Sequence, residues 1–255
     1  MPRWFKADLH VHTCLSPCAD VLMSPRRIVA EVLRHHIDIV AITDHNSVAN
    51  AVAVAKAAAQ SGIVVLPGME VCTREEVHVL AVFENQEAAQ ELGSCVYEHL
   101  SGVNDPDVFG WQVVANEKDE VERFEDRLLI GATDLSIDEV VDKIRRLNGL
   151  AIAAHIDREG FGIIGQLGFI PEKLPLDALE ISGHTGDEEA EKRFRNYSRY
   201  SFVRNSDAHA LDQLGANVTR YLLEEATVEE IRKAIHKLDG RSLEATSACG
   251  MSKKD

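Results

Sequence analysis

The sequence predicts an α/β protein whose strands form a closed or nearly closed barrel. Short apolar runs alternate with helical patterns along most of the 255 residues, and such alternation is typical of a parallel sheet. Several of these runs are almost continuous in Val and Ile, as expected of strands that are buried on both faces. Seven such runs suit a barrel better than an open sheet, although periodicity alone does not distinguish the two.

The expected elements follow one another as strand and helix. The strands are Trp4–Leu9, Ile37–Thr43, Ile63–Glu70, His78–Phe83, Leu150–His155, Ala178–Ser182 and Ser201–Ser206. The helices are Pro25–Arg34, Val48–Ser61, Gln86–His99, Ile137–Leu147, Glu188–Tyr200 and Val228–Lys237. Ser24 before Pro25 resembles an N-cap with proline at the first helical position. Thr227, with Glu230 three residues later, fits a capping box.

One segment interrupts the alternation. Between Glu84 and Asp126 there are twelve acidic residues and two basic ones, Lys118 and Arg123. Residues 101–133 are therefore interpreted as an acidic insertion in a single barrel domain that spans residues 1–244. The insertion either lies over the barrel mouth or is a solvated excursion without a role. The polar residues 245–255 are expected to form a disordered tail.

The sequence shows no sign of a targeting or membrane segment. The first twelve residues lack the basic segment and apolar run of a signal peptide, and no apolar run approaches the roughly 20 residues of a membrane helix. We therefore expect a cytoplasmic protein without a membrane partner. Five cysteines, an odd number, do not indicate a disulfide framework. Cys14 and Cys18 are interpreted as lining a crowded loop, with metal binding as the alternative.

The charge restricts the class of partner. The formal net charge is −15, whereas proteins that track along nucleic acid usually carry a basic face. No long nucleic acid is therefore expected as a partner. A small phosphorylated substrate is compatible with this charge, because bound metal ions can dominate the local charge of a site. The oligomeric state is left open.

Histidines and acidic residues recur where the expected strands end. The first strand runs into His10-Val11-His12, and residues two apart on a strand face the same side. Further motifs at strand ends are Thr43-Asp44-His45, Gly68-Met69-Glu70, His155 and Asp207-Ala208-His209, whereas His78 opens its strand. In parallel barrels this edge is where catalytic groups converge.

Imidazole and carboxylate groups together suit zinc, manganese or iron(II), and magnesium is possible. The candidate ligands are His10, His12, Asp20, His45, Glu70, His78, His155, Asp207 and His209. With about three to five protein ligands per ion, this set implies two or three divalent ions. A carboxylate such as Glu70 would then bridge two of them.

The motifs resemble those of the PHP superfamily, named for polymerase and histidinol phosphatase. The resemblance rests on Asp8-Leu9-His10-Val11-His12-Thr13, Thr43-Asp44-His45, Pro67-Gly68-Met69-Glu70, His155 and Ser206-Asp207-Ala208-His209, and it spans roughly residues 4 to 220. It implies a distorted seven-stranded (β/α)7 barrel of the TIM type with a trinuclear metal cluster at the C-terminal face of the strands. It also implies three ligand sets: His10, His12, Glu70 and Asp207; Glu70, His78 and His155; and Asp20, His45 and His209.

Metal ions in such a site would activate a water molecule that attacks phosphorus. Three further residues are candidates for catalytic roles. Arg158 follows His155 by three residues, and arginine makes bidentate contacts with phosphate. Asp44 would protonate the leaving group or, as the favoured alternative, orient His45. His184 follows the sixth strand and would face the substrate.

The leading hypothesis is a stand-alone metal-dependent phosphoesterase that hydrolyses a small phosphomonoester or nucleotide, such as a nucleoside bisphosphate or a short oligonucleotide. A histidinol-phosphate-type phosphatase is the alternative within the resembling family. Two hypotheses belong to other classes. One is an amidohydrolase, a class that typically places a lysine at the fourth strand, where His78–Phe83 has none. The other is a non-catalytic metal-binding regulatory module, which a complete ligand set disfavours.

Overall fold

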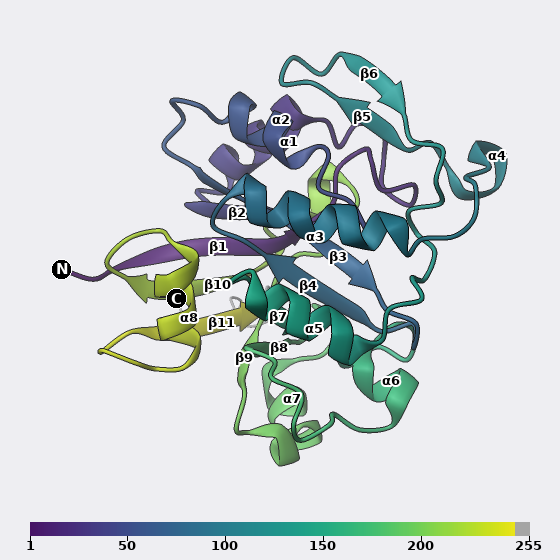
Figure 1. Cartoon of the computed structure of the whole chain (residues 1–255). Helices are drawn as coiled ribbons and strands as arrows, with labels where there is room; N and C mark the ends of the chain where they lie inside the picture. Colours follow the sequence, from purple (N-terminus) through teal and green to yellow (C-terminus); the bar gives the residue numbers. More distant parts are fainter. Residues whose placement is uncertain (248–255) are drawn as a thin grey trace.

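All seven predicted strands are present in the computed structural model, which describes residues 1–247 (Figure 1). They lie side by side in chain order within one sheet. Their bounds are β1 (Arg3–Val11), β2 (Ile39–Ile42), β3 (Val64–Cys72), β4 (His78–Val82), β7 (Leu150–Ala153), β8 (Ala178–Glu180) and β9 (Ser201–Val203).

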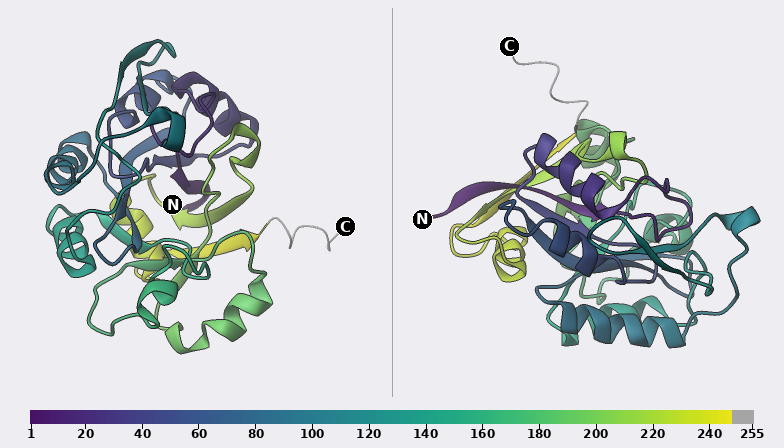
Figure 2. Two further views of the ribbon diagram at one scale, coloured as in Figure 1. Left: turned by 90° about the vertical axis from the view of Figure 1, so that its right-hand side faces the viewer. Right: turned by 90° about the horizontal axis from the view of Figure 1, so that it is seen from above.

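The sheet curves so that its first and last predicted strands meet. The segment after β9 pairs with the end of β1 through a parallel bridge between Val11 and Ala208, and the N–H of His12 donates to the carbonyl of Ala208 over 3.0 Å. The N–H of Leu9 donates to Asn205 Oδ1 over 2.7 Å. The result is a nearly closed barrel, viewed along its length in the left panel of Figure 2. The predicted fold class is confirmed.

Two further strands extend the sheet to nine within residues 1–247. β10 (Asn217–Leu223) pairs antiparallel with β1, and β11 (Ser242–Ser247) pairs antiparallel with β10. The expected tail therefore begins too early, because residues 245–247 belong to β11. The rest of that tail, residues 248–255, lies outside the described residues.

β4 departs from the expected parallel arrangement. It runs antiparallel to both β3 and β7, and its first residue, His78, is paired with Cys72 at the end of β3. The two strands approach closely at Gly68, where a Cβ atom would lie 2.5 Å from the carbonyl oxygen of Ala81. Because β4 is reversed, its start lies at the same barrel end as the C-terminal ends of its neighbours, which explains why His78 opens a strand.

Helices cover the outside of the sheet. The expected ones are α1 (Pro25–Arg34), α2 (Ala51–Ala57), α3 (Gln86–Glu98), α5 (Ile137–Arg146), α7 (Asp187–Arg193) and α8 (Val228–Ile235). The predicted helix Glu188–Tyr200 ends early, at Arg193, and a 3-10 turn η1 (Arg195–Tyr197) follows it. Three short turns were not predicted: α4 (Pro106–Phe109), α6 (Ile163–Leu167) and η2 (Leu211–Gln213).

Only half of the predicted capping box at α8 forms. Thr227 Oγ1 accepts from the N–H of Glu230. The Glu230 carboxylate instead accepts from the N–H of Glu224 and from Arg241 Nε. Ser24 occupies the N-cap of α1 without a side-chain hydrogen bond, and Pro25 is the first helical residue, as predicted.

Alternating side chains divide the core into two layers. Leu80, Val82 and Ile152 belong to the cluster inside the barrel, whereas Val79 and Ala81 pack outward in the cluster that includes residues of α3 and α5. Figure 1 shows these two helices in front of β3 and β4. Side-chain alternation with a period of two therefore fixes which residues of each strand face the barrel interior.

The acidic insertion contains a second small sheet, formed by β5 (Val113–Ala115) and β6 (Val121–Phe124). Amide side chains from the barrel hold the insertion. Asn50 bonds to the backbone of Val113 and Ala115, and Asn46 Nδ2 donates to the carbonyls of Leu129 and Gly131 over 2.7 and 2.8 Å. Figure 1 shows the hairpin and α4 toward the end at which the arrow of β1 points.

Within residues 1–247, no helix is both long enough and apolar enough to span a bilayer.

Candidate metal centre

Eight of the nine predicted ligands meet at one end of the barrel. They come from the ends of β1, β3, β7 and β9, from the segment after β2 and from the start of reversed β4. Six of them are buried, the side chain of Asp207 is 9% exposed, and that of His209, at 27%, is the most open. The eight residues are His10, His12, His45, Glu70, His78, His155, Asp207 and His209.

A β-bulge aims the two histidines of β1 into the site. Between Asp8 and Val11 the pairing with β2 shifts, since three steps along β1 correspond to two steps along β2. Leu9 belongs to the apolar cluster inside the barrel, and the extra residue lets His10 face inward beside it. His12 then follows His10 on the same side. Bulges commonly re-aim side chains next to functional sites.

Glu70 lies at the centre of the group. Its Oε1 approaches His78 Nδ1 to 2.8 Å and His155 Nε2 to 3.1 Å, and its Oε2 approaches His45 Nδ1 to 3.1 Å. The same carboxylate is 3.4 Å from His10 and 3.3 Å from His12. One buried acid thus contacts five imidazoles, as a carboxylate that bridges metal ions would.

Asp207 forms the outer side of the group. Its Oδ1 lies 3.1 Å from His10 Nε2 and 3.3 Å from His12 Nε2. Its Oδ2 forms an ion pair with Arg158 Nη1 at 2.7 Å. The backbone at Asp207 has φ 50°, and that at His155 has φ 27°. Non-glycine residues rarely adopt positive φ, and such strain concentrates at functional sites.

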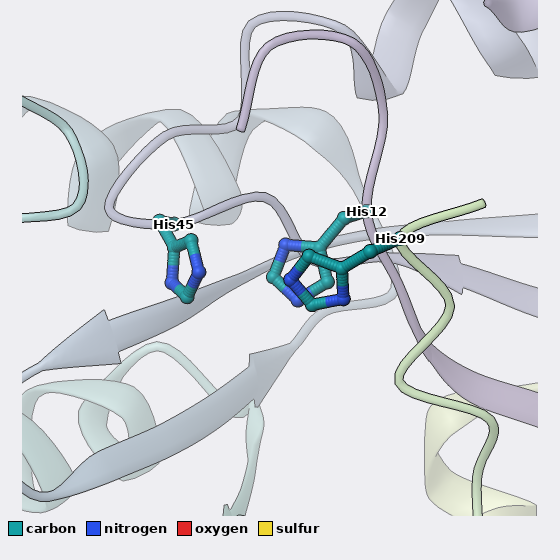
Figure 3. A group of neighbouring side chains, drawn as sticks. All are labelled: His12, His45 and His209. Carbon is teal, nitrogen blue, oxygen red and sulfur yellow. The ribbon is translucent and has the colours of Figure 1, made fainter. Parts of the chain in front are cut away.

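Three sets of side chains offer ligand atoms within 4.8 Å of one another. The first is His10, His12, Glu70 and Asp207, which equals the first set that the resemblance implies. The second is His45, Glu70 and His78, with His155 in contact with Glu70. The third is His12, His45 and His209. Figure 3 shows the rings of His12 and His209 overlapping, with His45 beside them; the ring centroids of His12 and His209 are 4.1 Å apart.

The donor set fits divalent cations. His78 Nε2 and His155 Nδ1 are buried and make no hydrogen bond within residues 1–247, and buried polar atoms of this kind call for a partner. The Nε2 atoms of His10 and His12 lie 3.2 Å apart and face the same two carboxylates. Imidazole with carboxylate suits zinc, manganese or iron(II).

The electrostatics point the same way. Burial opposes the charged form of Glu70, yet the surrounding imidazoles, His78 first, hold its pKa well below the ordinary value. Burial also lowers the pKa of His12, but hydrogen bonds with Asp207 and Glu70 outweigh it and raise that pKa to about 9. Burial lowers the pKa of His45 to about 3. The site therefore gathers ionised carboxylates around nitrogen atoms, and metal binding replaces protons on such nitrogens.

His155 belongs to none of the three sets, although it contacts Glu70. Asp20 also belongs to none of them. Its side chain is exposed, and Oδ1 accepts from the N–H of Leu22 over 2.8 Å in a local turn. Its backbone N–H donates to the carbonyl of His209, so the residue adjoins the site through its main chain. A metal role for Asp20 stays a prediction.

Asp44 is linked to the ring of His12, not to the ring of His45 as expected. Its two oxygens accept from Thr13 and from Ser16 Oγ over 2.7 and 2.8 Å. Ser16 Oγ in turn lies 2.9 Å from His12 Nδ1 and accepts from the backbone N–H of His45. Asp44 therefore orients the ring of His12 through Ser16, and it reaches His45 only through that residue's backbone.

Sequence reasoning missed Glu180, the last residue of β8. This carboxylate is 1% exposed and lies 3.0 Å from His10 Nδ1. It also accepts from the N–H of His155 and from Asn205 Nδ2. Ligands commonly donate their second ring N–H to a carboxylate of this kind. The available signal was an acid at the end of a buried strand, the same signal that identified Glu70.

A cavity of about 320 Å³ opens beside the candidate metal ligands. Arg158 lines it together with Ile130 of the acidic insertion and Phe161. The Phe161 ring stacks on His78 with centroids 4.4 Å apart. His184, the third candidate for a catalytic role, is exposed and lines a neighbouring cavity that Arg158 shares.

The cysteines take no part in the three ligand sets. All four within the described residues, Cys14, Cys18, Cys72 and Cys95, are free thiols, and Cys249 lies outside. Burial, together with the charge of Asp44, raises the pKa of the Cys14 thiol to about 12. Cys14 packs in a small cluster with Val113 and Ala115, so it lines the loop against the insertion.

The family model of the PHP domain matches residues 8–200 of the chain. A protein of Methanocaldococcus jannaschii, the uncharacterized protein MJ1587, is 33% identical over 95 residues, which cover 34% of this chain and 55% of that protein. The match therefore spans about half the length of this relative.

Solved structures share the fold. The lesion-specific endonuclease PfuEndoQ from Pyrococcus furiosus matches with a TM-score of 0.71 at 18% identity, covering 94% of this chain and 58% of its own. An endonuclease Q complex with a 27-mer duplex substrate that has an abasic lesion at the active site matches with a TM-score of 0.66 at 19% identity. The match covers 94% of this chain and 58% of that chain. A putative metal-dependent phosphoesterase from Bifidobacterium adolescentis matches with a TM-score of 0.54 at 19% identity, covering 82% of this chain and 89% of its own.

Proposed function

Because this chain belongs to the PHP domain family, we propose that it is a metal-dependent phosphoesterase that hydrolyses small phosphomonoesters with two or three divalent ions. The observation that carries the proposal is the position of Glu70, which contacts five imidazoles, beside a cavity that Arg158 lines. When bound, divalent ions in such a site activate water and neutralise charge on phosphoryl oxygens.

The protein's own side chains would bind the phosphoryl group and orient the candidate ligands. Arg158 carries five N–H donors in a planar fork, and the ion pair with Asp207 fixes the fork at the rim of the cavity. A phosphoryl group at this rim would accept from the remaining donors. Glu180 and Ser16 hold the rings of His10 and His12 so that both Nε2 atoms face the carboxylates. We assign His184 to the substrate side of the neighbouring cavity.

The test is metal content by elemental analysis, paired with phosphate release from 4-nitrophenyl phosphate and from a nucleoside 3′,5′-bisphosphate. Wild type is expected to hold two to three ions and to release phosphate. His10→Asn is expected to lose both properties. His36→Asn is the matched control, because His36 is exposed and its φ of 51° is one that asparagine tolerates. Bound metal without turnover of either compound would contradict the proposed activity.

A second candidate is an endonuclease that acts on damaged DNA. The fold likeness to endonuclease Q and its duplex complex favours it and stands against the expectation of no long nucleic acid. The net charge of −15 opposes it, since phosphate neutralisation supplies most nonspecific DNA affinity. Incision of a fluorescent duplex with one abasic site, assayed beside phosphomonoester hydrolysis, separates the two. We expect phosphate release without incision.

A further inference from the structure

A second cavity adjoins the metal centre. It measures about 510 Å³, within the range of ~300–1,000 Å³ that ligand pockets occupy. Arg158, Asp207 and His209 line both this cavity and the one that contains the metal ligands. The two spaces therefore meet at Arg158. We call the second space the distal cavity; the side chains that distinguish it are His184, Ser206, Asp212, Gln213 and Asn217.

The lining of the distal cavity selects for hydroxyl groups. It offers two amides, one hydroxyl, one imidazole and one carboxylate, all of which exchange hydrogen bonds with an alcohol. Among the described residues that line it, Arg158 is the one Arg or Lys, and no Phe, Tyr or Trp ring is present. With Arg158 holding the first phosphate group, a second one would find no further Arg or Lys there, and a nucleobase would lack an aromatic ring to stack on.

The distal cavity is connected to the ligand loop. Gln213 Oε1 accepts from the backbone N–H groups of His209 and Ala210 over 2.8 and 3.1 Å, so its amide ties this wall to the segment that carries two of the ligands. Gly183 makes room for Asn217 on another wall, because a Cβ at Gly183 would lie 2.3 Å from Asn217 Nδ2.

We infer that the distal cavity binds the alcohol part of the substrate and that this part is a polyhydroxylated alcohol, such as a sugar. The inference rests on the proposed phosphoesterase function. A phosphoryl group held by Arg158 at the junction of the two cavities would direct its ester oxygen into the distal cavity. The substrate class is then a sugar-type phosphomonoester with a single phosphate group, in preference to a nucleoside bisphosphate.

The experiment measures kcat/KM of the metal-loaded full chain for ribose 5-phosphate, methyl phosphate and adenosine 5′-monophosphate. Wild type is expected to prefer ribose 5-phosphate. Asn217→Leu is expected to lower kcat/KM for ribose 5-phosphate about tenfold, the equivalent of one lost hydrogen bond, and to lower it less for methyl phosphate. Gly183→Ala, which displaces the Asn217 amide with a single methyl group, is expected to act in the same direction.

Asn196→Leu is the matched control, since Asn196 is exposed on η1, which precedes β9 at the other end of that strand. Hydrolysis of none of the three compounds by wild type would refute the proposed function itself. Hydrolysis with equal losses for ribose 5-phosphate and methyl phosphate in both variants would overturn the inference alone. Preference for adenosine 5′-monophosphate, reduced by Phe161→Ala and unaffected by Asn217→Leu, would place the organic part at Phe161 instead and would also overturn it.

Discussion

The metal centre and the acidic insertion both concentrate carboxylates, but they use them in opposite ways. Glu70 is 1% exposed and is surrounded by imidazoles. In the insertion, all four residues of β6 are exposed, Glu122 among them. A buried charge is stable only where neighbouring groups compensate for the lost hydration, whereas an exposed charge interacts mainly with water.

The two regions also differ in how they are tied to the barrel. Each candidate ligand of the metal centre belongs to a barrel strand or lies within a few residues of its end. The insertion is held through amide side chains, Asn46 and Asn50, that bond to its backbone. Strand geometry therefore determines the first region, while the second depends on contacts between segments far apart in sequence. We therefore expect substitutions in the metal centre to have larger effects than substitutions at the surface of the insertion.

The largest effect is expected at Glu70. Glu70→Gln removes the charge that five imidazoles share, so metal content should fall and kcat/KM should drop at least about 10³-fold, a loss of roughly 4 kcal/mol of transition-state stabilisation. Glu122→Gln on exposed β6 is the matched control and should change neither. Retention of full metal content by Glu70→Gln, measured by elemental analysis, would remove Glu70 from the centre of the site.

Removal of metal should produce the next largest effect. A ligand at 1,000 times its dissociation constant stabilises a folded protein by about 4 kcal/mol, which corresponds to a shift in Tm on the order of 10 °C for a domain of this size. Calorimetry with and without a chelator measures this shift. The shift should disappear in Asp207→Asn, because Asp207 lies between His10 and His12 in the first ligand set. Equal Tm values for both forms of wild type would contradict a structural contribution of metal.

Glu180→Gln should have a smaller effect. Its carboxylate orients His10 without belonging to any of the ligand sets, and loss of such a partner typically costs about 10–100-fold in metal affinity. Competition with a chelator of known affinity measures the change. Glu180→Asp tests whether position matters beyond charge and should recover part of the affinity at most. An unchanged affinity in Glu180→Gln would show that metal binding does not depend on the charge of Glu180 beside His10.

The sequence was sufficient to bring most of the candidate ligands together because two periodicities coincide. Alternation along strands locates buried faces, and the convergence of strand ends locates the site. These two rules brought His10, His45, Glu70, His155 and Asp207 to one edge. They did not explain His78, because the reversed direction of β4 arises from its pairing with β3 and β7 and leaves no local signal.

The features that sequence reasoning missed depend on distant contacts. β10 pairs with β1 from more than 200 positions away, and β6 exposes all its residues, so it shows no apolar alternation. The hydrogen bond from Ser16 to Asp44 links two loops, so sequence adjacency predicts a role of Asp44 in orienting His45 and gives no indication of its link to His12. Local pattern predicts where a side chain faces, whereas its partner depends on the assembled barrel.

The smallest effect is expected at the surface of the insertion. Trp111 is 51% exposed, and its ring lies 5.0 Å from that of Phe124, so Trp111→Ala should cost about 1 kcal/mol or less of unfolding free energy. Leu129→Ala in the same insertion should cost about 2–5 kcal/mol, because Leu129 is 1% exposed within the apolar cluster. Denaturant unfolding compares the two variants. If the insertion is only attached beside the mouth, Trp111→Ala should also keep wild-type kcat/KM, since Ile130 rather than Trp111 lines the metal-site cavity. A loss of activity in Trp111→Ala without a loss of stability would mean that the exposed hairpin itself contacts the substrate, and the contrast between the two regions would then hold for structure but fail for function.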